Sequence, residues 1–155
     1  MTITCREKIA DAPIIADTSA LVSLATDTDH NHIPAKEAAA RLHKVSRPII
    51  LPADIFVETI NVLGKRSGHE TALKAAAELL RPEGQFVLIE TMPYLHRALE
   101  KLKDQAPGVS LTDCMVMVVA DVYSTKDIFG FDMQFVNAGY HRLEPSTKWK
   151  LGAES

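Results

Sequence analysis

The sequence predicts an α/β fold in which helices cover both faces of a mainly parallel β-sheet. Short apolar runs of strand length alternate with longer segments whose apolar residues recur at helical spacing, as in βαβ units. The chain has 155 residues, of which 46% are hydrophobic, so one sizeable core and a single domain over residues 1–155 are expected. The core is expected at about 14–143, with a loosely held N-terminal extension and C-terminal tail.

Strands are expected where short apolar runs end at turn-forming or polar residues. Ile14–Ala16 is followed by Asp17-Thr18-Ser19, whose small polar side chains suit the start of a helix. Pro52 closes the second run and suits the first turn of the next helix. Strands are therefore predicted at 14–16, 48–51, 86–89 and 127–131, with a last edge strand at 140–143.

The segments between these strands have helical periodicity. Ser67-Gly68 provides an end for one helix, and Ala106-Pro107-Gly108 provides a turn between two others. Ser110 precedes a helix that is apolar nearly all round and is therefore expected to be buried on most sides. Helices are predicted directly after the first strand and at 34–45, 53–66, 69–80, 93–103 and 113–123.

The helix at 53–66 has a narrow polar stripe bordered by apolar residues. At about 100° per residue, this stripe contains Asp54, Glu58, Asn61 and Lys65. Phe56, Ile60 and Leu63 lie on the opposite side. A helix on an open surface more often has a broad charged face, so the narrow stripe favours a helix that borders a cleft.

Four acidic residues lie in or just past apolar runs, where a solvated charge is unexpected. Asp17 and Asp132 follow predicted strands, Asp113 begins the buried helix, and Glu58 lies on the polar stripe. In open parallel sheets, sites form outside the carboxyl ends of the strands, where the following helices also begin. The four acids are therefore expected to meet at one edge of the sheet. Like charges gathered in this way repel, so cations are expected to bridge them.

Carboxylate oxygens are the ligands that Mg²⁺ and Mn²⁺ prefer, and ions held in this way can activate water for attack on a phosphodiester. Asp17, Glu58, Asp113 and Asp132 are therefore predicted to be both catalytic and metal-binding. The chain contains no Gly-x-Ser-x-Gly elbow, no phosphate-binding Gly-rich loop and no paired-His zinc motif.

Each acid also has an ordinary structural interpretation. Asp17 is a favoured helix cap, and Ser110-Leu111-Thr112-Asp113 resembles a capping box. Glu58 could be a solvated helix acid, and Asp132 could form a turn before Met133. A shared site accounts for all four acids at once.

Neighbouring residues are candidates for supporting roles. Asn61 could bond a metal-bound water or a carboxylate, Ser19 could bond Asp17, and Thr112 adjoins Asp113. His30 and His32 lie in a polar loop that offers no third ligand, so solvated histidines are favoured over a metal site.

The charge and the cysteines limit the functional classes. The net charge is −3, so any nucleic-acid surface must be a local basic patch, for which Lys65 and Arg66 are predicted. Cys5 and Cys114 lie far apart and are interpreted as reduced thiols of a cytoplasmic protein. There is no apolar segment of membrane-spanning length and no basic-then-apolar leader, so neither export nor membrane association is expected.

Four segments resemble the PIN-domain family, and specifically the VapC-type ribonuclease toxins of bacterial and archaeal toxin–antitoxin pairs. The resemblance extends from about 14 to 143, and its segments are Ile15-Ala16-Asp17-Thr18-Ser19-Ala20-Leu21, Glu58-Thr59-Ile60-Asn61-Val62-Leu63, Leu111-Thr112-Asp113 and Gly130-Phe131-Asp132-Met133-Gln134-Phe135. The chain departs from the family at Gly130, where Thr or Ser is commoner, and in its longer lead before Ile14.

The resemblance implies a Rossmann-like, three-layer α/β/α sandwich that cleaves single-stranded RNA with Mg²⁺ or Mn²⁺. It implies that Asp17, Glu58, Asp113 and Asp132 hold the metal and that Asn61 supports the metal shell. It also implies homodimers and a small antitoxin partner whose C-terminal segment covers the active cleft.

Two other kinds of protein share part of this sequence pattern. A non-catalytic RNA- or protein-binding PIN-like module would bind RNA equally well in EDTA and would show no turnover. An aspartyl-phosphate hydrolase or a receiver domain also has an Asp after its first strand. The hydrolase, however, has a second Asp where Ser19 stands, and the acidic pair of a receiver is not apparent.

Overall fold

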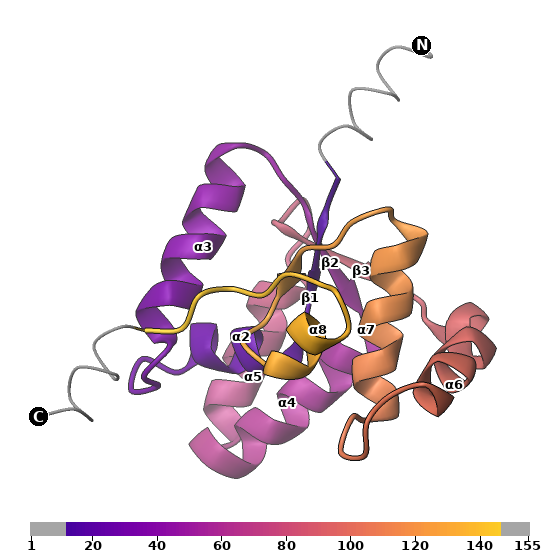
Figure 1. Ribbon diagram of the computed structural model, residues 1–155. Coiled ribbons are helices and arrows are strands. Elements are labelled where there is room, and N and C mark those ends of the chain that lie inside the picture. The colour runs from indigo at the N-terminus through magenta and orange to yellow at the C-terminus, as the bar shows by residue number, and fades with distance from the viewer. Residues whose placement is uncertain (1–11, 147–155) are drawn as a thin grey trace, which may run out of the picture.

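Four parallel strands form the sheet, in the order β3-β2-β1-β4. The computed structural model describes residues 12–146, which Figure 1 shows in colour. The strands are β1 (Ile14–Ala16), β2 (Ile49–Pro52), β3 (Phe86–Ile89) and β4 (Ile128–Phe129). In the register of the sheet, Ile15 pairs with Ile50 on one side and with Ile128 on the other. The predicted parallel sheet is confirmed.

Helices connect the strands and flank the sheet. They are α2 (Thr18–Ala25), α3 (His32–Lys44), α4 (Ala53–Ser67), α5 (His69–Leu79), the 3₁₀ turn η1 (Met92–Tyr94), α6 (Leu95–Lys103), α7 (Leu111–Val122) and α8 (Met133–Asn137). Helix α7 packs against β1 and β2, and α6 packs on α7. Figure 1 shows α3 on the opposite side of the sheet from α7. The predicted α/β fold with flanking helices is therefore confirmed.

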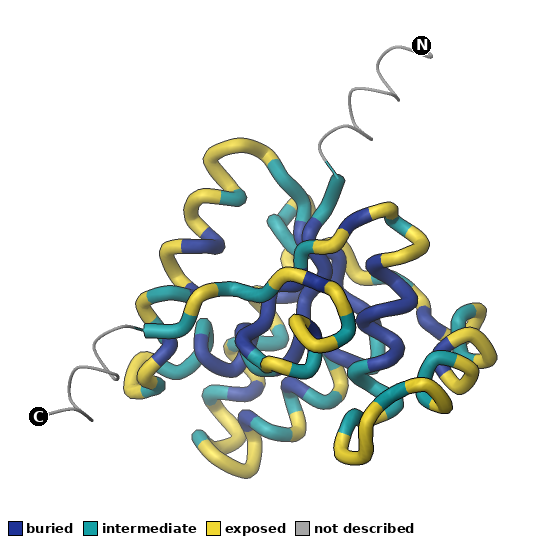
Figure 2. Tube along the Cα trace, in the orientation of Figure 1, coloured by how far each residue is buried: buried dark blue, intermediate teal, exposed yellow. Residues whose placement is uncertain are grey.

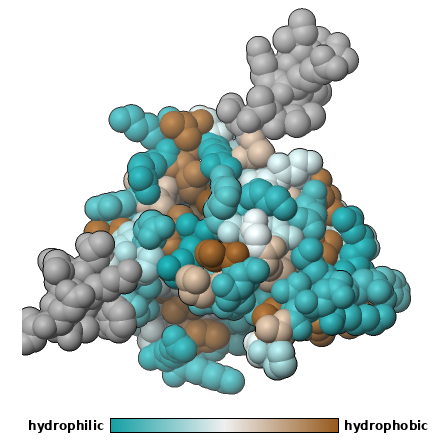
Figure 3. Space-filling view, in the orientation of Figure 1, coloured by the Kyte–Doolittle hydropathy of each residue, from teal (hydrophilic) through white to brown (hydrophobic). Residues whose placement is uncertain are grey.

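The core is centred on the two middle strands and α7. Every residue of β1 and β2 is buried, and so are residues 114–120 of α7. Figure 2 shows this buried chain as the dark blue interior. Strands covered on both faces need continuous apolar runs, which is why these strands are recognisable in the sequence. The face seen in Figure 3 is mainly hydrophilic, with small separate hydrophobic areas.

The last strand is shorter than predicted. β4 ends at Phe129 because the next backbone groups bond outside the ladder. The N–H of Phe131 donates to Ser19 Oγ at 3.0 Å, and the carbonyl of Gly130 accepts from Leu143 N at 2.8 Å. The predicted edge strand at 140–143 is instead a single β-bridge, between Asp127 and His141.

Helix α8 was not predicted. A turn before Met133 is one interpretation of Asp132 in the sequence, and the structure shows Asp132 as the N-cap of this five-residue helix. Helix α3 begins at His32 rather than at 34, and Pro52 ends β2 instead of lying in the first turn of α4. The shifts at His32 and Pro52 lie at element ends, where the local pattern is weakest.

Two predictions concern residues outside the described part of the chain. They are the N-terminal extension, with Cys5, and the C-terminal tail beyond Ser146. Cys114 is buried and free. Within residues 12–146, no helix is both long and apolar enough to span a membrane.

Candidate active site

A pocket of about 510 Å³ lies where the direction of the strand order reverses. The chain proceeds from β1 to β2 and β3 on one side, and then places β4 on the other side of β1. Asp17 follows β1, and Asp132 lies three residues beyond β4. Asp17, Glu58, Asp113 and Asp132 all line this pocket, which we call the acid pocket. The topology thus brings the four predicted acids together at the crevice expected for an open parallel sheet.

Asp17 is the most buried of the four acids, with 3% of its surface exposed. It is the N-cap of α2, and its Oδ2 accepts hydrogen bonds from Ser19 N at 3.3 Å and from Ser19 Oγ at 2.9 Å. Burial, and next the charge of Asp132, raise its pKa to about 7, against the lowering effect of the bonds from Ser19. The capping interpretation of Asp17 is therefore confirmed, and it coexists with a place in the pocket.

Ser19 joins the ends of β1 and β4. Its hydroxyl donates to Asp17 Oδ2 and also accepts the backbone N–H of Phe131 at 3.0 Å. The backbone N–H of Asp17 donates in turn to the Phe129 carbonyl at 2.9 Å. Ser19, which is itself bonded by the chain after β4, therefore orients the carboxylate of Asp17, and a backbone hydrogen bond ties residue 17 to β4.

Gly130 gives Asp17 the space that it occupies. A Cβ atom added at Gly130 would lie 2.8 Å from Asp17 Cβ and 3.1 Å from its Oδ2, closer than packed atoms approach. In this chain, glycine at position 130 thus allows β4 to pass directly beside the buried acid.

Asp113 and Asp132 approach each other through Gln134. Asp113 forms a capping box with Ser110, in which two hydrogen bonds of 3.0 Å join side chain to backbone in both directions. The amide of Gln134 donates to Asp113 Oδ2 at 3.2 Å and to Asp132 Oδ2 at 3.5 Å. Burial, and next the charge of Asp113, raise the pKa of Asp132, while Arg142 opposes the rise. The capping box is confirmed as predicted.

Glu58 borders the pocket from α4. Burial raises its pKa most, and the charges of Asp113 and Asp54 raise it further, while the hydroxyls of Thr18 and Thr112 oppose the rise. The Thr18 hydroxyl is buried without a hydrogen bond of good geometry, so its effect on Glu58 is through proximity. Thr112 thus lies within reach of the acids, although it is not among the residues that line the pocket.

Of the four residues in the polar stripe of α4, only Glu58 lines the pocket. The lining residues from this helix are Glu58, Val62 and Arg66, one turn apart. Asn61 and Lys65 are exposed and do not line the pocket. The reason is that Ile55, Thr59 and Leu63 occupy the core side of α4, which turns the outer part of the stripe to solvent.

The donor set fits a hard divalent cation in kind. It offers carboxylate oxygens. Burial, and next the charges of neighbouring acids, raise the pKa values of Asp17, Glu58 and Asp132, so a bound cation would favour their ionised forms. Within residues 12–146, no group of three or more His, Cys, Asp and Glu side chains is already arranged to hold a metal. A cation would therefore use fewer protein ligands and more water, as Mg²⁺ commonly does, or draw the carboxylates closer.

Gln134 and Arg142 are functional candidates that no sequence pattern indicates on its own. Gln134 bonds two of the acids, and Arg142 lines the pocket. Gln134 lies in α8, which the sequence does not predict, and Arg142 follows that helix, so the positions of both depend on tertiary contacts. The sequence signal for Gln134 was its place two residues after Asp132. Arg47, unlike Arg142, does not line the acid pocket. Its Nη2 forms an ion pair with Asp127 Oδ2 at 2.7 Å, which indicates a structural role.

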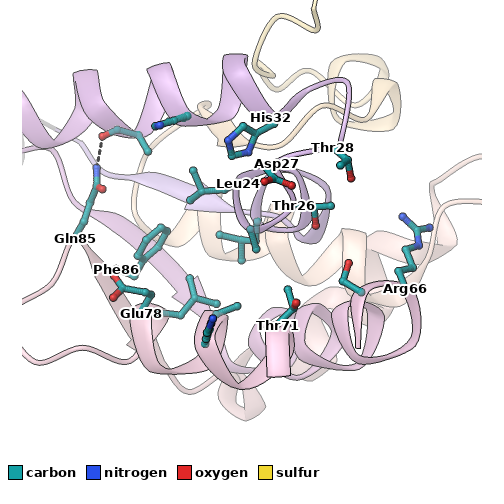
Figure 4. A pocket seen from close by; sticks show the side chains of 18 of the residues that line it. Leu24, Thr26, Asp27, Thr28, His32, Arg66, Thr71, Glu78, Gln85 and Phe86 are labelled. Atoms are coloured by element: carbon teal, nitrogen blue, oxygen red, sulfur yellow. Dashed lines mark hydrogen bonds between the residues drawn. The ribbon is translucent and has the colours of Figure 1, made fainter. Parts of the chain in front are cut away.

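A second pocket, of about 840 Å³, contains none of the four acids. Figure 4 shows it with Gln85 toward one end and Arg66 toward the other. Gln85 is fixed by donating its amide N–H to the Ala39 carbonyl at 2.6 Å. Arg66 lines both pockets and therefore marks the boundary between them.

The fold and the acid pocket define a class of protein. A family model for the PIN domain matches residues 14–139, and the chain belongs to the PIN domain family. Among solved structures, the chain is similar to VapC20 from Mycobacterium tuberculosis, described as a toxin that cleaves the sarcin–ricin loop. The two are 26% identical, the match covers 85% of this chain and 99% of that one, and the TM-score is 0.72. The comparison with curated proteins found no significant match.

Proposed function

We propose that this chain is a metal-dependent endoribonuclease that cleaves single-stranded regions of RNA, and that it is the toxin of a type II toxin–antitoxin pair. The observation that carries the proposal is the acid pocket, where Asp17, Glu58, Asp113 and Asp132 meet at the strand-order reversal of a PIN fold. The similarity to an RNA-cleaving VapC toxin supports the choice of RNA as substrate.

The four acids would hold Mg²⁺ or Mn²⁺, which supplies an activated water and stabilises charge on the phosphate when it is bound. Asp17 is the principal ligand in this proposal, because it is buried, is oriented by Ser19 and gains most from a neighbouring cation. Asp113 contributes the oxygen that its capping box leaves free, since its Oδ2 already accepts from Ser110 and Gln134.

Residues close to the four acids have supporting roles in this proposal. Ser19 orients Asp17, and Thr112 orients Glu58. Arg66 contacts the substrate from the rim of the pocket, and Lys65 contributes positive charge next to it. Asn61 is exposed, so it would support the metal only through water.

The proposal extends to the setting of the protein. It places the chain in the cytoplasm as a homodimer, with a small antitoxin that covers the acid pocket until RNA cleavage is required. These statements rest on the family and on the similarity to a VapC toxin.

The test is cleavage of a mixed pool of structured and single-stranded RNA by purified protein, with Mg²⁺, with Mn²⁺ and with EDTA. The protein is first shown to be folded and free of a bound inhibitor. Asp17→Asn and Asp113→Asn are expected to abolish the metal-dependent cuts. The matched control is Glu37→Gln, which removes an exposed acid of α3 outside the pocket and should cleave like the wild type.

An active Asp17→Asn protein would reject the assignment of the site. If folded wild-type protein binds RNA equally well with metal and with EDTA and never cuts it, the chain is a binding module.

A further inference from the structure

Arg142 is held at the acid pocket by the backbone on both sides of it. The carbonyl of His141 accepts from Ile128 N at 2.9 Å, and Leu143 N donates to the Gly130 carbonyl at 2.8 Å. The chain after α8 therefore returns along β4, and Arg142 lies beside the turn that leads to Asp132. Its side chain is half-buried and lines the pocket.

The guanidinium group is positioned but is not neutralised. Its Nη1 donates to the Phe131 carbonyl at 2.7 Å. Among residues 12–146 it forms no ion pair, although its charge opposes the pKa rise of Asp132. Arg47 and Lys101, by contrast, pair with Asp127 and Asp121. A guanidinium group has five N–H donors, so Arg142 keeps most of its donors for a ligand.

The charges around the pocket indicate what that ligand is. Arg66 and Arg142 are the arginines that line it among the described residues, together with the four acids. Cations bound by the acids would attract a phosphate to the centre, and a planar guanidinium at the wall matches two phosphate oxygens at once. Arg142 comes from a segment whose backbone is hydrogen-bonded on both sides of it, whereas Arg66 is exposed on the last turn of α4.

We infer that Arg142 binds a backbone phosphate of the RNA strand in the acid pocket and orients that strand against the carboxylates. This inference rests on the proposed function, because it takes RNA as the ligand. The competing explanation is that Arg142 acts only through the Phe131 carbonyl and holds the turn before Asp132 in place.

The experiment measures RNA binding and RNA cleavage separately. Binding of a fluorescent single-stranded RNA of mixed sequence is followed by anisotropy in the Asp17→Asn protein, with Mg²⁺ present and at several NaCl concentrations. Arg142→Ala and Arg142→Lys are compared in that background. The control is Arg97→Ala, because Arg97 is an exposed arginine of α6 that lies outside the acid pocket.

Arg142→Ala is expected to raise the RNA Kd roughly tenfold, as for loss of a charge-assisted hydrogen bond. It should also reduce the slope of log K against log salt by about 0.7, the effect of one phosphate contact on single-stranded nucleic acid. Arg142→Lys should restore the slope, because the charge returns, but only part of the affinity. Arg97→Ala should change neither quantity.

An unchanged Kd and slope in Arg142→Ala would overturn the inference, and so would failure of the Asp17→Asn parent to bind RNA. A thermal unfolding scan of each variant shows whether the turn before Asp132 has been disturbed. Because binding and cleavage are measured separately, failure of the Arg142 inference can be distinguished from failure of the proposed function. Without cleavage by the wild type, an altered salt slope would still support the phosphate contact. If the wild type cleaves RNA but Arg142→Ala leaves the salt slope unaltered, only the phosphate contact of Arg142 would be rejected, and the proposed nuclease function would stand.

Discussion

The buried carboxylate of Asp17 should make the metal-free protein less stable as the pH rises. Its pKa is raised from 3.8 to about 7, so between these pH values the folded protein keeps a proton that the unfolded chain has lost. The free energy of unfolding therefore falls with rising pH across this window, and the full cost is present above pH 7. Since one pKa unit corresponds to about 1.4 kcal/mol, the cost is on the order of 4 kcal/mol.

Asp17→Asn removes this cost because the amide carries no charge. In EDTA, the variant should be about 4 kcal/mol more stable than the wild type at pH 8 and only about 1 kcal/mol more stable at pH 4.5, near the lower end of the window. Some pH dependence should remain, because burial also raises the pKa values of Glu58, Asp54 and Asp132.

The assay is urea unfolding followed by circular dichroism at pH 4.5, 6 and 8, with Glu37→Gln as the control for loss of an exposed acid. A decline in stability that is as steep in Asp17→Asn as in the wild type would refute the reasoning, because the cost would then lie elsewhere.

Two further predictions concern the contacts that hold Asp17. Gly130→Ala should destabilise the protein by about 1–3 kcal/mol and reduce RNA cleavage, because the added methyl group meets Asp17. Gly64→Ala, at an open position inside α4, should instead stabilise it by about 0.5–1 kcal/mol, and equal unfolding midpoints for the two variants would contradict this. Ser19→Ala should cost about 1–3 kcal/mol in urea unfolding, since the Phe131 N–H loses its acceptor. Cleavage should fall in this variant as well, and full activity would show that Ser19 does not orient Asp17.

Much of the fold could be predicted because its strands are buried on both faces. The burial of β1 and β2 requires apolar side chains in unbroken runs, and these stand out against the helical periodicity between them. The end of β4 could not be predicted in the same way. It is set by the bond from Phe131 N to Ser19 Oγ, which joins residues 112 positions apart.

The acid pocket also combines features that the local sequence predicts with features that depend on tertiary contacts. Asp17 and Asp113 were recognisable as acids at element starts that the local sequence defines, and the parallel topology then placed them at one edge. The polar stripe of α4 was recognisable too, but the sequence could not say which margin would meet the pocket. Asn61 and Lys65 lie on the solvent side of that stripe, and Arg66 reaches the pocket instead.

Hydrophobic periodicity and helix caps are local properties, so the alternation of strands and helices and the choice of the four acids can be predicted without the structure. Only the folded chain shows that Gly130 must be small, that Gln134 bonds two acids, and that Arg142 lines the pocket with no ion pair among the described residues. These features depend on how the chain after β4 returns along the sheet. That path is fixed by hydrogen bonds between residues distant in sequence, which no local pattern encodes.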